Sequence, residues 1–389
     1  AFRRRKEHTR REDPMADDLT AAPHATASHP TLASYLRAVH ACVERTLRQT
    51  GLPPAQLDLL LASAPCGAPP AAKLLRHPLA PFYLVTRSLG ASVGADAEPL
   101  GAGFLLFLYA LGLIDDVQDE EIPAAFAPFG PAVALNSGVL LLWLSIDTLW
   151  ACEEAAPAAR LRATLRAHAL RLASGQHRDL AGRNAVGATD EAVAIARDKS
   201  AICGLALEYA GIYARARIGD PSRELPPLGA VGDALAEMQQ ITDDVTDLFG
   251  ARAGADLRTG TRSVPLAALF EATPEAERPA LAARLPTASP DEVVRLVYAS
   301  GAMQAVARVT DAARFRVHEA FAGVPGDRAY LTLFLAWLDD LAATFYKPLP
   351  IRVAVDLLSI APPDRMAPGD AELLERLLAS CRAAQQRAA

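Results

Sequence analysis

The sequence predicts an all-α protein that folds as one large helical bundle. Apolar residues recur every three or four positions along most of the chain, which is the spacing of helices with one buried face. No stretch shows the alternation of apolar and polar residues that is typical of strands. Hydrophobic residues make up 51% of the 389-residue chain, which is enough for a sizeable core.

In chain order, this periodicity predicts helices separated by proline- and glycine-containing loops. The expected helices are 31–50, 56–62, 73–90 with two prolines in its first turns, 105–121, 132–152, 157–173, 191–218, 238–250, 266 onward with a break at 285–290, 327–346 and 370–387. The apolar helix 132–152 is expected to belong to the core, and so are Trp143, Trp150 and Trp337.

The domain organisation follows from composition. Residues 1–30 are expected to be a basic, disordered tail. Their basic run is not followed by the apolar segment of a signal peptide. Met15 is a candidate start site. Residues 31–350 are expected to form the all-α domain, and residues 351–389 a C-terminal helical extension.

Charge, cysteines and apolar stretches exclude several classes of protein. The net charge of −6 disfavours nucleic-acid binding. Five scattered cysteines without a CxxC pair fit neither a disulfide framework nor a zinc site, and fit a reducing cytoplasm. The stretches 100–114 and 133–146 are expected to be too short or too interrupted for membrane spans. We therefore expect a cytoplasmic protein without stable membrane insertion.

The main functional signal is an acidic motif that occurs twice. Residues 105–121 read LLFLYALGLIDDVQDEE, and residues 238–250 read MQQITDDVTDLFG. On a helix, residues three and four apart share a face, so each segment has a carboxylate-rich front and an apolar back. The acids are Asp115, Asp116, Asp119, Asp243, Asp244 and Asp247.

The repetition changes what these acids predict. One such face alone is more readily explained as a solvated helix surface. Two facing motifs would bring six carboxylates together, and like charges that close repel each other without a cation between them. Mg²⁺ prefers oxygen ligands and commonly takes one or two carboxylates together with substrate phosphates. The sequence therefore predicts a Mg²⁺–diphosphate clamp above a hydrophobic shaft.

With these motifs placed, the sequence resembles the trans-isoprenyl diphosphate synthase (polyprenyl synthetase) family over about residues 73–265, with weaker helical continuity to about residue 346. One DDxxD motif is weak evidence, whereas six pieces in the family's order are specific. The pieces are KLLRHP at 73–78, DDVQD at 115–119, GQHRDL at 175–180, DKSA at 198–201, QITDDVTD at 240–247 and DLRTGTRSVP at 256–265.

The resemblance implies an isoprenoid synthase-type helical bundle around a deep central cavity, usually a homodimer. It implies condensation of an allylic prenyl diphosphate with isopentenyl diphosphate, with three Mg²⁺ ions as cofactor. The implied metal-binding residues are Asp115, Asp119 and Asp243, supported by Asp116, Asp244 and Asp247. The implied catalytic residues are Lys199, Gln240, Asp115 and Asp243. The implied substrate-binding residues are Lys73, Arg76, Gln176, Lys199, Arg262, Phe107 and Leu111.

Two of these substrate-binding residues concern product length. Phe107 and Leu111 precede Asp115 by two turns and one turn on the same helix face, a region where bulk limits chain growth in the family. Because Phe107 is large and Ala110 is small, the sequence leaves the product length open. His77 and His177 match no metal-ligand pattern, and Cys203 is expected to be a small core residue.

The chain departs from the family in two places. Residues 120–130 read EEIPAAFAPFG and lack the Arg-Arg-Gly segment that binds both diphosphates in the family. At the position before Arg262, where the family usually has lysine, this chain has Thr261. Charge-assisted contacts to phosphate are strong, so these losses weaken the case for the isopentenyl diphosphate site. An alternative is a class I terpene synthase on the same fold, which ionises one prenyl diphosphate. A third, less favoured hypothesis is a non-catalytic partner subunit, which the two intact acidic motifs oppose.

Overall fold

The protein is seen in a computed structural model that describes residues 29–64, 69–152, 158–183, 187–220, 222–249, 260–261, 263–345 and 366–388. Within these ranges it is a helical protein without strands, as the sequence predicts. The first part holds α1 (Leu32–Arg48), α2 (Pro54–Ser63), the 3-10 helix η1 (Ala71–Arg76), α3 (Ala80–Ser88), α4 (Ala97–Gln118), α5 (Pro131–Trp150) and α6 (Ala158–Ala181). The second part holds α7 (Thr189–Lys199), α8 (Ile202–Ile218), α9 (Leu228–Phe249), α11 (Val264–Ala272), η2 (Glu275–Glu277), α12 (Arg278–Arg284), η3 (Leu285–Thr287), α13 (Pro290–Ala299), α14 (Ala302–Phe321), α15 (Arg328–Phe345) and α16 (Pro368–Ala388).

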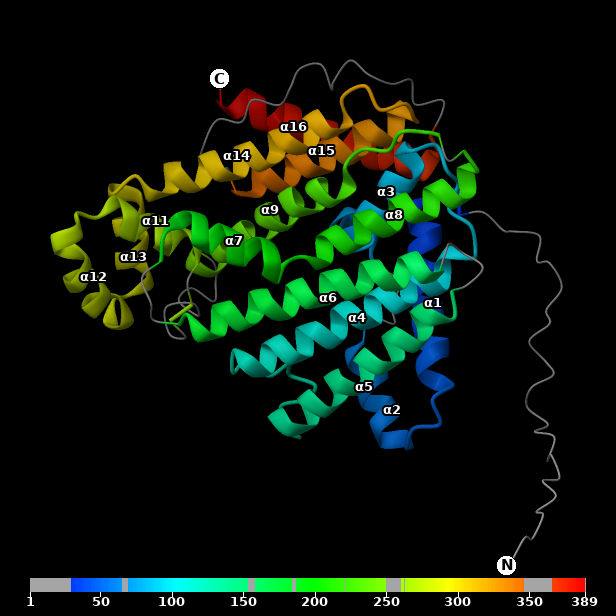
Figure 1. The fold of residues 1–389 in the computed structure, drawn as a ribbon, viewed down its shortest axis with the longest axis horizontal. Coiled ribbons are helices and arrows are strands. Elements are labelled where there is room, and N and C mark those ends of the chain that lie inside the picture. The colour runs from blue at the N-terminus through cyan, green and yellow to red at the C-terminus, as the bar shows by residue number, and fades with distance from the viewer. Residues whose placement is uncertain are drawn as a thin grey trace, which may run out of the picture.

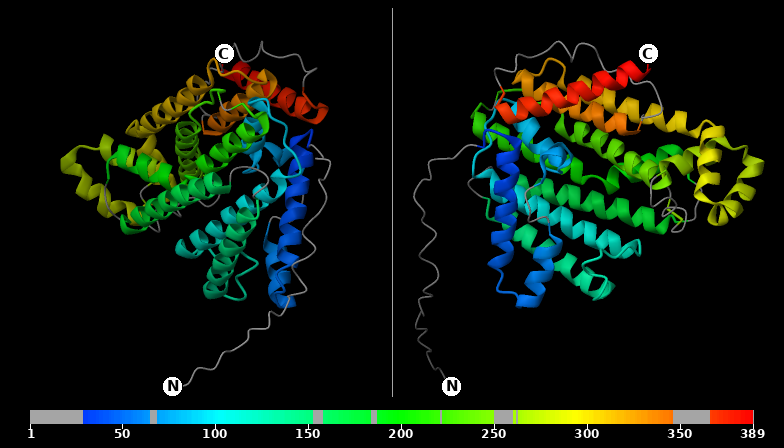
Figure 2. Two further views of the ribbon diagram at one scale, coloured as in Figure 1. Left: turned by 45° about the vertical axis from the view of Figure 1, so that its right-hand side comes forward. Right: turned by 180° about the vertical axis from the view of Figure 1, so that it is seen from behind.

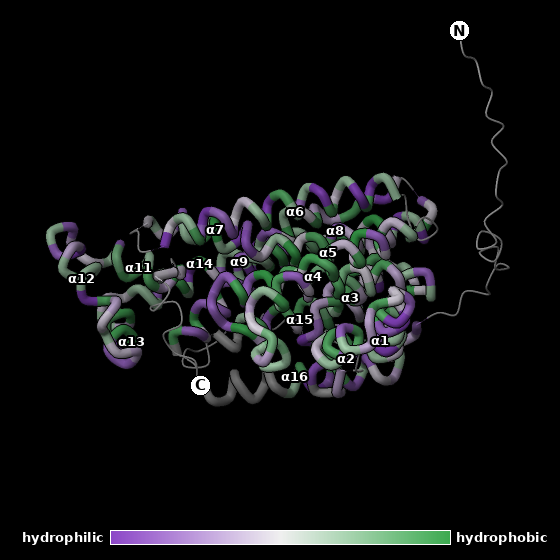
Figure 3. The backbone as a smooth tube through the Cα atoms, turned by 90° about the horizontal axis from the view of Figure 1, so that it is seen from below, coloured by the Kyte–Doolittle hydropathy of each residue, from purple (hydrophilic) through white to green (hydrophobic). Residues whose placement is uncertain are grey.

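The long helices form one bundle around a shared apolar core (Figure 1). Helix α4 packs on α5, α8 packs on α9, and α14 and α15 also pack against α9. Helix α1 crosses the bundle at one end, and α12 and α13 lie at the opposite end (Figure 2). Coloured by hydropathy, helices α4, α5 and α8 are largely apolar, whereas polar residues gather on α1 and at the α12 and α13 end (Figure 3).

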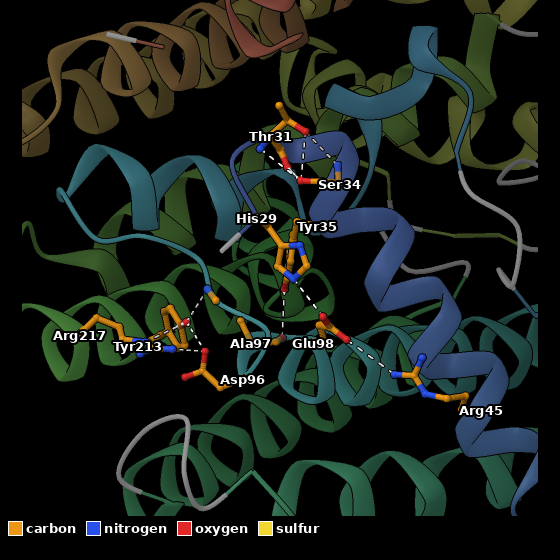
Figure 4. A network of polar contacts seen from close by, with 11 residues as sticks. His29, Thr31, Ser34, Tyr35, Arg45, Asp96, Ala97, Glu98, Tyr213 and Arg217 are labelled. Carbon is orange, nitrogen blue, oxygen red and sulfur yellow. Dashed lines mark hydrogen bonds and ion pairs between the residues drawn. The ribbon is translucent and has the colours of Figure 1, made fainter. Parts of the chain in front are cut away.

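A polar network fixes where α4 begins (Figure 4). Glu98, in the first turn of α4, accepts a hydrogen bond from His29 at 3.0 Å and pairs with Arg45 of α1 at 3.7 Å. Just before the helix, Asp96 accepts a hydrogen bond from the hydroxyl of Tyr213 on α8 at 2.9 Å. These contacts anchor the start of α4 between α1 and α8, so the opposite end of the helix carries the first acidic motif at a fixed place.

Helix α16 is tied to the bundle by one buried carboxylate. Asp370 accepts hydrogen bonds from the backbone N–H of Leu32 at 3.0 Å, the hydroxyl of Tyr83 at 3.2 Å and the hydroxyl of Tyr330 at 3.1 Å. These donors belong to α1, α3 and α15. The residues between α15 and α16, 346–365, lie outside the described ranges, as do residues 1–28 of the expected tail.

Two expected helix boundaries were wrong. The helix expected to end at residue 173 continues to Ala181, so the GQHRDL segment is helical. The helix expected over 191–218 is two helices, α7 and α8, with a break at Ser200–Ala201. The apolar pattern continues through this break, so periodicity alone does not reveal it. The break places Lys199 at the end of α7.

The prediction of a core position was wrong for two tryptophans on α5. Trp143 and Trp150 are 65% and 51% exposed. Helix α5 carries apolar residues on all sides. It packs against α4 through the side that holds its small residues, where a Cβ on Gly138 would lie only 3.2 Å from the carbonyl oxygen of Ala110. The opposite side of the helix is left open, because α5 lies at the edge of the described bundle.

Helices α4 and α5 are longer than the apolar stretches from which they were predicted. At 22 and 20 residues, both are long and apolar enough to cross a membrane by length and composition alone, so the length argument fails for them. The most apolar window of α4 is 56% buried in the bundle and that of α5 is 33% buried. Core helices of soluble proteins pass the same test, so this finding is weak evidence for a span.

Candidate active site

A cavity of about 830 Å³ lies between α3, α4, α6, α8, α9 and α15. One face of α4 builds much of its wall, because Phe104, Phe107, Leu108 and Leu111 recur at helical spacing. The same face continues into Asp115 and Gln118, so the wall changes from apolar to polar along one helix. Helices α6, α9 and α15 add Leu172, Leu235 and Trp337 to the apolar part.

Asp115 is held by an amide from a neighbouring helix. The Nε2 of Gln176 on α6 donates to Asp115 at 2.7 Å and to the side-chain oxygen of Gln118 at 2.9 Å. Burial raises the pKa of Asp115, and the charge of Lys199 opposes that rise. The GQHRDL segment therefore orients the first acid of the motif toward the cavity.

The same segment also holds the cavity lysine. A Cβ on Gly175 would lie 2.5 Å from the backbone nitrogen of Lys199, so glycine lets α6 approach the end of α7. The buried carboxylate of Asp179 then accepts from the Lys199 ammonium at 2.8 Å. Burial lowers the pKa of Lys199, but Asp179 and Asp115 raise it more, so the pKa lies above its usual value. Lys199 is thus a fixed positive charge on the cavity wall.

The last acid of the first motif is paired with an arginine that the sequence analysis did not identify. Asp119 follows the last residue of α4, and its Oδ1 lies 2.5 Å from the Nη2 of Arg183. Arg183 comes from the turn after α6, four residues beyond Asp179. No motif in the sequence indicated Arg183 as a site residue. Only the tertiary fold, which brings the end of α6 near the end of α4, places these two side chains together.

In the second motif the first two acids differ in surroundings. Asp243 lines the cavity, is solvent-exposed, and accepts from Gln239 of its own helix at 3.2 Å. Asp244 is buried and accepts from Gln240 at 2.9 Å and from the backbone N–H of Val264 at 2.7 Å. Burial raises the pKa of both carboxyls.

Asp244 is therefore part of a structural chain of hydrogen bonds. Its partner Gln240 also lines the cavity and accepts from the Ser200 hydroxyl at 2.8 Å. Through Ser200, Gln240 and Asp244, the break between α7 and α8 is connected to α9 and to the first residue of α11. This placement favours a structural role for Asp244.

The six acids of the two motifs differ in their position relative to the cavity. Asp115 and Asp243 line the cavity, whereas Asp116, Asp119, Asp244 and Asp247 do not. Adjacent helical residues point about 100° apart, so the two acids of a DD pair need not face the cavity equally. Across the described ranges, no three His, Cys, Asp or Glu side chains form a ready-made metal site. The donors still fit Mg²⁺, which binds through one or two carboxylates and completes its shell with phosphates and water.

The other predicted site residues divide into three groups. Phe107, Leu111, Gln176, Lys199, Gln240 and Arg76 line the cavity. Lys73 is exposed and lies in η1 with Arg76, but it does not line the cavity. Arg262 falls outside the described residues.

Three residues to which the sequence analysis assigned no role in the site also line the cavity. They are His77, His177 and Cys203. His77 lies 3.0 Å from His40 of α1, nitrogen to nitrogen, and accepts from the backbone N–H of Leu79 at 3.2 Å. Burial and the neighbouring His40 lower the pKa of His77 to about 3. His77 is therefore a neutral group at physiological pH.

Comparison with known proteins identifies similar folds and one family. The family model described as polyprenyl synthetase matches residues 73–299. Among curated proteins, none matches this sequence.

Many solved structures share the fold. A decaprenyl diphosphate synthase from Rhodobacter capsulatus is 21% identical, with a TM-score of 0.68 over 82% of this chain and 98% of that one. A geranylgeranyl pyrophosphate synthetase from Pyrococcus horikoshii is 17% identical, with a TM-score of 0.65 over 81% of this chain and 96% of that one. A polyprenyl synthase from Caulobacter crescentus, in complex with calcium and isoprenyl diphosphate, is 19% identical, with a TM-score of 0.64 over 81% of this chain and 96% of that one.

Proposed function

The chain belongs to the polyprenyl synthetase family, and from this premise we propose that it is a Mg²⁺-dependent prenyltransferase. Its reaction would condense an allylic prenyl diphosphate with isopentenyl diphosphate. One observation supports this most: an apolar cavity whose polar end brings together Asp115, Asp243 and Lys199 from three helices. Such a site can hold a diphosphate at one end and a prenyl chain along the rest.

The cavity residues have separable tasks in this proposal. Asp115, Asp119 and Asp243 would hold Mg²⁺, supported by Asp116, Asp244 and Asp247, with three ions expected from the resemblance. When bound, Mg²⁺ supplies Lewis-acid stabilisation of the leaving diphosphate. Gln176 holds the carboxylate of Asp115 in place. Lys199, kept charged by Asp179, binds diphosphate oxygens and stabilises the charge that develops on them.

The apolar wall keeps water from the allylic cation. Its volume of about 830 Å³ lies within the range of small-molecule sites. Phe104, Phe107, Leu108 and Leu111 form a continuous surface along which a prenyl chain can lie. Phe107 and Leu111 are therefore proposed to contact the growing chain. Excluding water matters because a free water molecule would quench the cation.

The second substrate would bind near η1. Arg76 lines the cavity, and Lys73 lies one turn away on the same 3-10 helix. We assign both to the diphosphate of isopentenyl diphosphate, together with Arg262. Gln240, at the cavity wall beside Ser200, is proposed to support substrate binding.

A class I terpene synthase is the second candidate function, and one observation favours it. Residues 120–130 contain no arginine or lysine, so few cations are available for a second diphosphate. Such an enzyme would ionise one prenyl diphosphate in the same cavity and would not need isopentenyl diphosphate.

We propose that the protein is a cytoplasmic homodimer, and the exposed apolar side of α5 supports the dimer. Leu135, Val139 and Trp143 recur every four residues and are 42%, 43% and 65% exposed. A second copy of this chain would cover such a stripe. Analytical ultracentrifugation of the wild-type protein and of Trp143→Glu tests this: a dimer that the substitution converts to monomer supports the assembly.

A product assay tests the function itself. Purified protein with Mg²⁺ is given dimethylallyl, geranyl, farnesyl or geranylgeranyl diphosphate, each with and without isopentenyl diphosphate. Longer diphosphates that form only with isopentenyl diphosphate support the prenyltransferase. Hydrocarbons or alcohols formed from one prenyl diphosphate support the terpene synthase and contradict chain elongation. No turnover by folded protein favours a non-catalytic partner subunit.

A further inference from the structure

Arg183 occupies an unusual position beside the first acidic motif. It lies two residues after the end of α6, yet its guanidinium contacts the end of α4. Its Nη2 lies 2.5 Å from the Oδ1 of Asp119. Its contacts with the backbone carbonyl of Gln118, at 3.4 and 3.5 Å, are long and therefore weak. The ion pair with Asp119 is thus the one strong contact of this side chain.

The guanidinium keeps donors available. Arginine has five N–H donors, and the Nε of Arg183 is buried without a hydrogen-bond partner among the described residues. The side chain is 24% exposed and that of Asp119 is 34% exposed, so both can be reached from solvent. Arginine binds phosphate through two parallel hydrogen bonds, which a compact ammonium cannot do.

Other positive charge near the motif is scarce. Among the cavity-lining residues, the only lysine or arginine side chains in the described chain are Arg76 and Lys199. Residues 120–130, which directly follow Asp119, contain no lysine or arginine. A bound diphosphate carries several negative charges. Arg183 is therefore an additional positive charge that the fold places against the end of the motif.

We propose that Arg183 is a diphosphate-binding residue that exchanges its partner when substrate binds. Without substrate it neutralises Asp119. When the Asp119 carboxylate binds a Mg²⁺ ion, the guanidinium is released and takes up an oxygen of the diphosphate on the same ion. This inference rests on the proposed function, since it requires a Mg²⁺–diphosphate ligand.

The exchange requires little movement. If Asp119 helped to hold a Mg²⁺–diphosphate, the guanidinium would already lie beside the bound ligand, because its Nη2 is 2.5 Å from the Asp119 carboxylate. Rotation of the Arg183 side chain would suffice, and the weak contacts to the Gln118 carbonyl are easily given up.

The proposal predicts opposite effects on two ligands. Loss of the guanidinium removes a contact to the diphosphate, so inorganic pyrophosphate should bind more weakly at saturating Mg²⁺. It also frees Asp119 from a competing cation, so Mg²⁺ alone should bind at least as tightly as before. A merely structural role for Arg183 would weaken both, because a disturbed α4–α6 contact would harm the whole site.

Isothermal titration calorimetry on the full chain tests this with wild type, Arg183→Ala, Arg183→Lys and Arg166→Ala. Arg166 is an exposed arginine on the same α6, so Arg166→Ala is the matched control. We expect Arg183→Ala to bind Mg²⁺–pyrophosphate about 10- to 100-fold more weakly, the range for losing one charge-assisted contact. Arg183→Lys should recover part of that loss, Arg166→Ala should equal wild type, and Mg²⁺ alone should not bind Arg183→Ala more weakly.

Two results overturn the inference. One is equal binding of Mg²⁺–pyrophosphate by wild type and Arg183→Ala. The other is a parallel loss of Mg²⁺ and of pyrophosphate binding in Arg183→Ala. If Arg183→Ala does not fold, Arg183→Lys carries the test, since wild-type affinity in this variant would contradict a forked phosphate contact. Failure of the wild-type protein to bind Mg²⁺–pyrophosphate would instead contradict the proposed function, which separates the two failures.

Discussion

The two acidic motifs have the same spacing but different neighbours. In the first motif, side chains from α6 and from the turn after it hold the acids: Gln176 binds Asp115 and Arg183 binds Asp119. In the second motif, Asp243 is held by Gln239 of its own helix, and Asp244 is bound by Gln240 and by a backbone N–H of α11. The same sequence pattern therefore has two different surroundings. The first motif is bound by residues of α6 and the turn after it, whereas the second motif also connects α9 to α11.

This difference shows that spacing does not assign roles within a motif. The first acid of each motif lines the cavity. The second acid of the second motif is buried and satisfied by protein donors. A cavity-lining carboxylate should matter for turnover, and a buried carboxylate with protein partners should matter for stability.

The largest effect is expected at the acids that line the cavity. Asp115→Ala and Asp243→Ala should each lower kcat/KM by at least about 100-fold, because each removes an electrostatic contact to the reacting diphosphate. Asp116→Ala, in the same motif but outside the cavity lining, should lose less than about 10-fold. Steady-state kinetics across a Mg²⁺ titration measures both. Equal losses at Asp115 and Asp116 would remove the distinction within the motif.

The next largest effect is expected in the second motif, where Asp243 should affect activity and Asp244 should affect stability. Asp244→Ala leaves the buried N–H of Val264 without an acceptor, which should lower the free energy of unfolding by about 1–3 kcal/mol. Asp243→Ala, at an exposed position, should change it by less than about 0.5 kcal/mol. Urea denaturation of the protein without Mg²⁺ checks this. A stability loss at Asp243 equal to that at Asp244 would contradict the structural role of Asp244.

A smaller effect is expected from the amides that hold the two cavity acids. Gln176→Ala removes a 2.7 Å bond to Asp115 from a neighbouring helix and should lower kcat/KM by about 10-fold. Gln239→Ala removes a 3.2 Å bond to Asp243 within one helix and should have a smaller effect. The two variants are compared under identical Mg²⁺ and substrate concentrations. A larger loss at Gln239 would reverse the comparison.

The smallest effect concerns pH. Burial raises the pKa of Asp244 above its ordinary 3.8, so the folded protein holds this proton more tightly than the unfolded chain does. Unfolding then releases a proton between pH 3.8 and the raised native value. The extra stability that the protonated Asp244 carboxyl gives to the folded protein is fully present below pH 3.8. It is lost as the pH rises through the native pKa of Asp244.

Denaturation curves at several pH values, without Mg²⁺, measure this slope. Asp244→Asn cannot titrate, so its stability should fall less steeply with rising pH than that of the wild type, by at most about 1.4 kcal/mol per pH unit. Identical slopes in wild type and Asp244→Asn would contradict the raised pKa of Asp244.

Local pattern determined much of this protein. The periodicity of apolar residues predicted the all-α class and most helices, because helix faces are set by residues three and four apart. Six ordered motif pieces predicted the polyprenyl synthetase family, which the family model confirms. The run from Phe107 through Leu111 to Asp115 was predicted to share one face, and in the structure it lines one cavity.

Other features depended on neighbours that are distant in the sequence. The exposure of Trp143 follows from the position of α5 at the edge of the bundle, and no property of the α5 sequence distinguishes an inner helix from an outer one. The partners of Asp119 and Asp244 are 64 and 20 residues away. Periodicity tells which residues of a helix face the same way. Which of those faces meets a cavity, an arginine or solvent is decided only when helices pack, because burial and ion pairing require atoms from other parts of the chain.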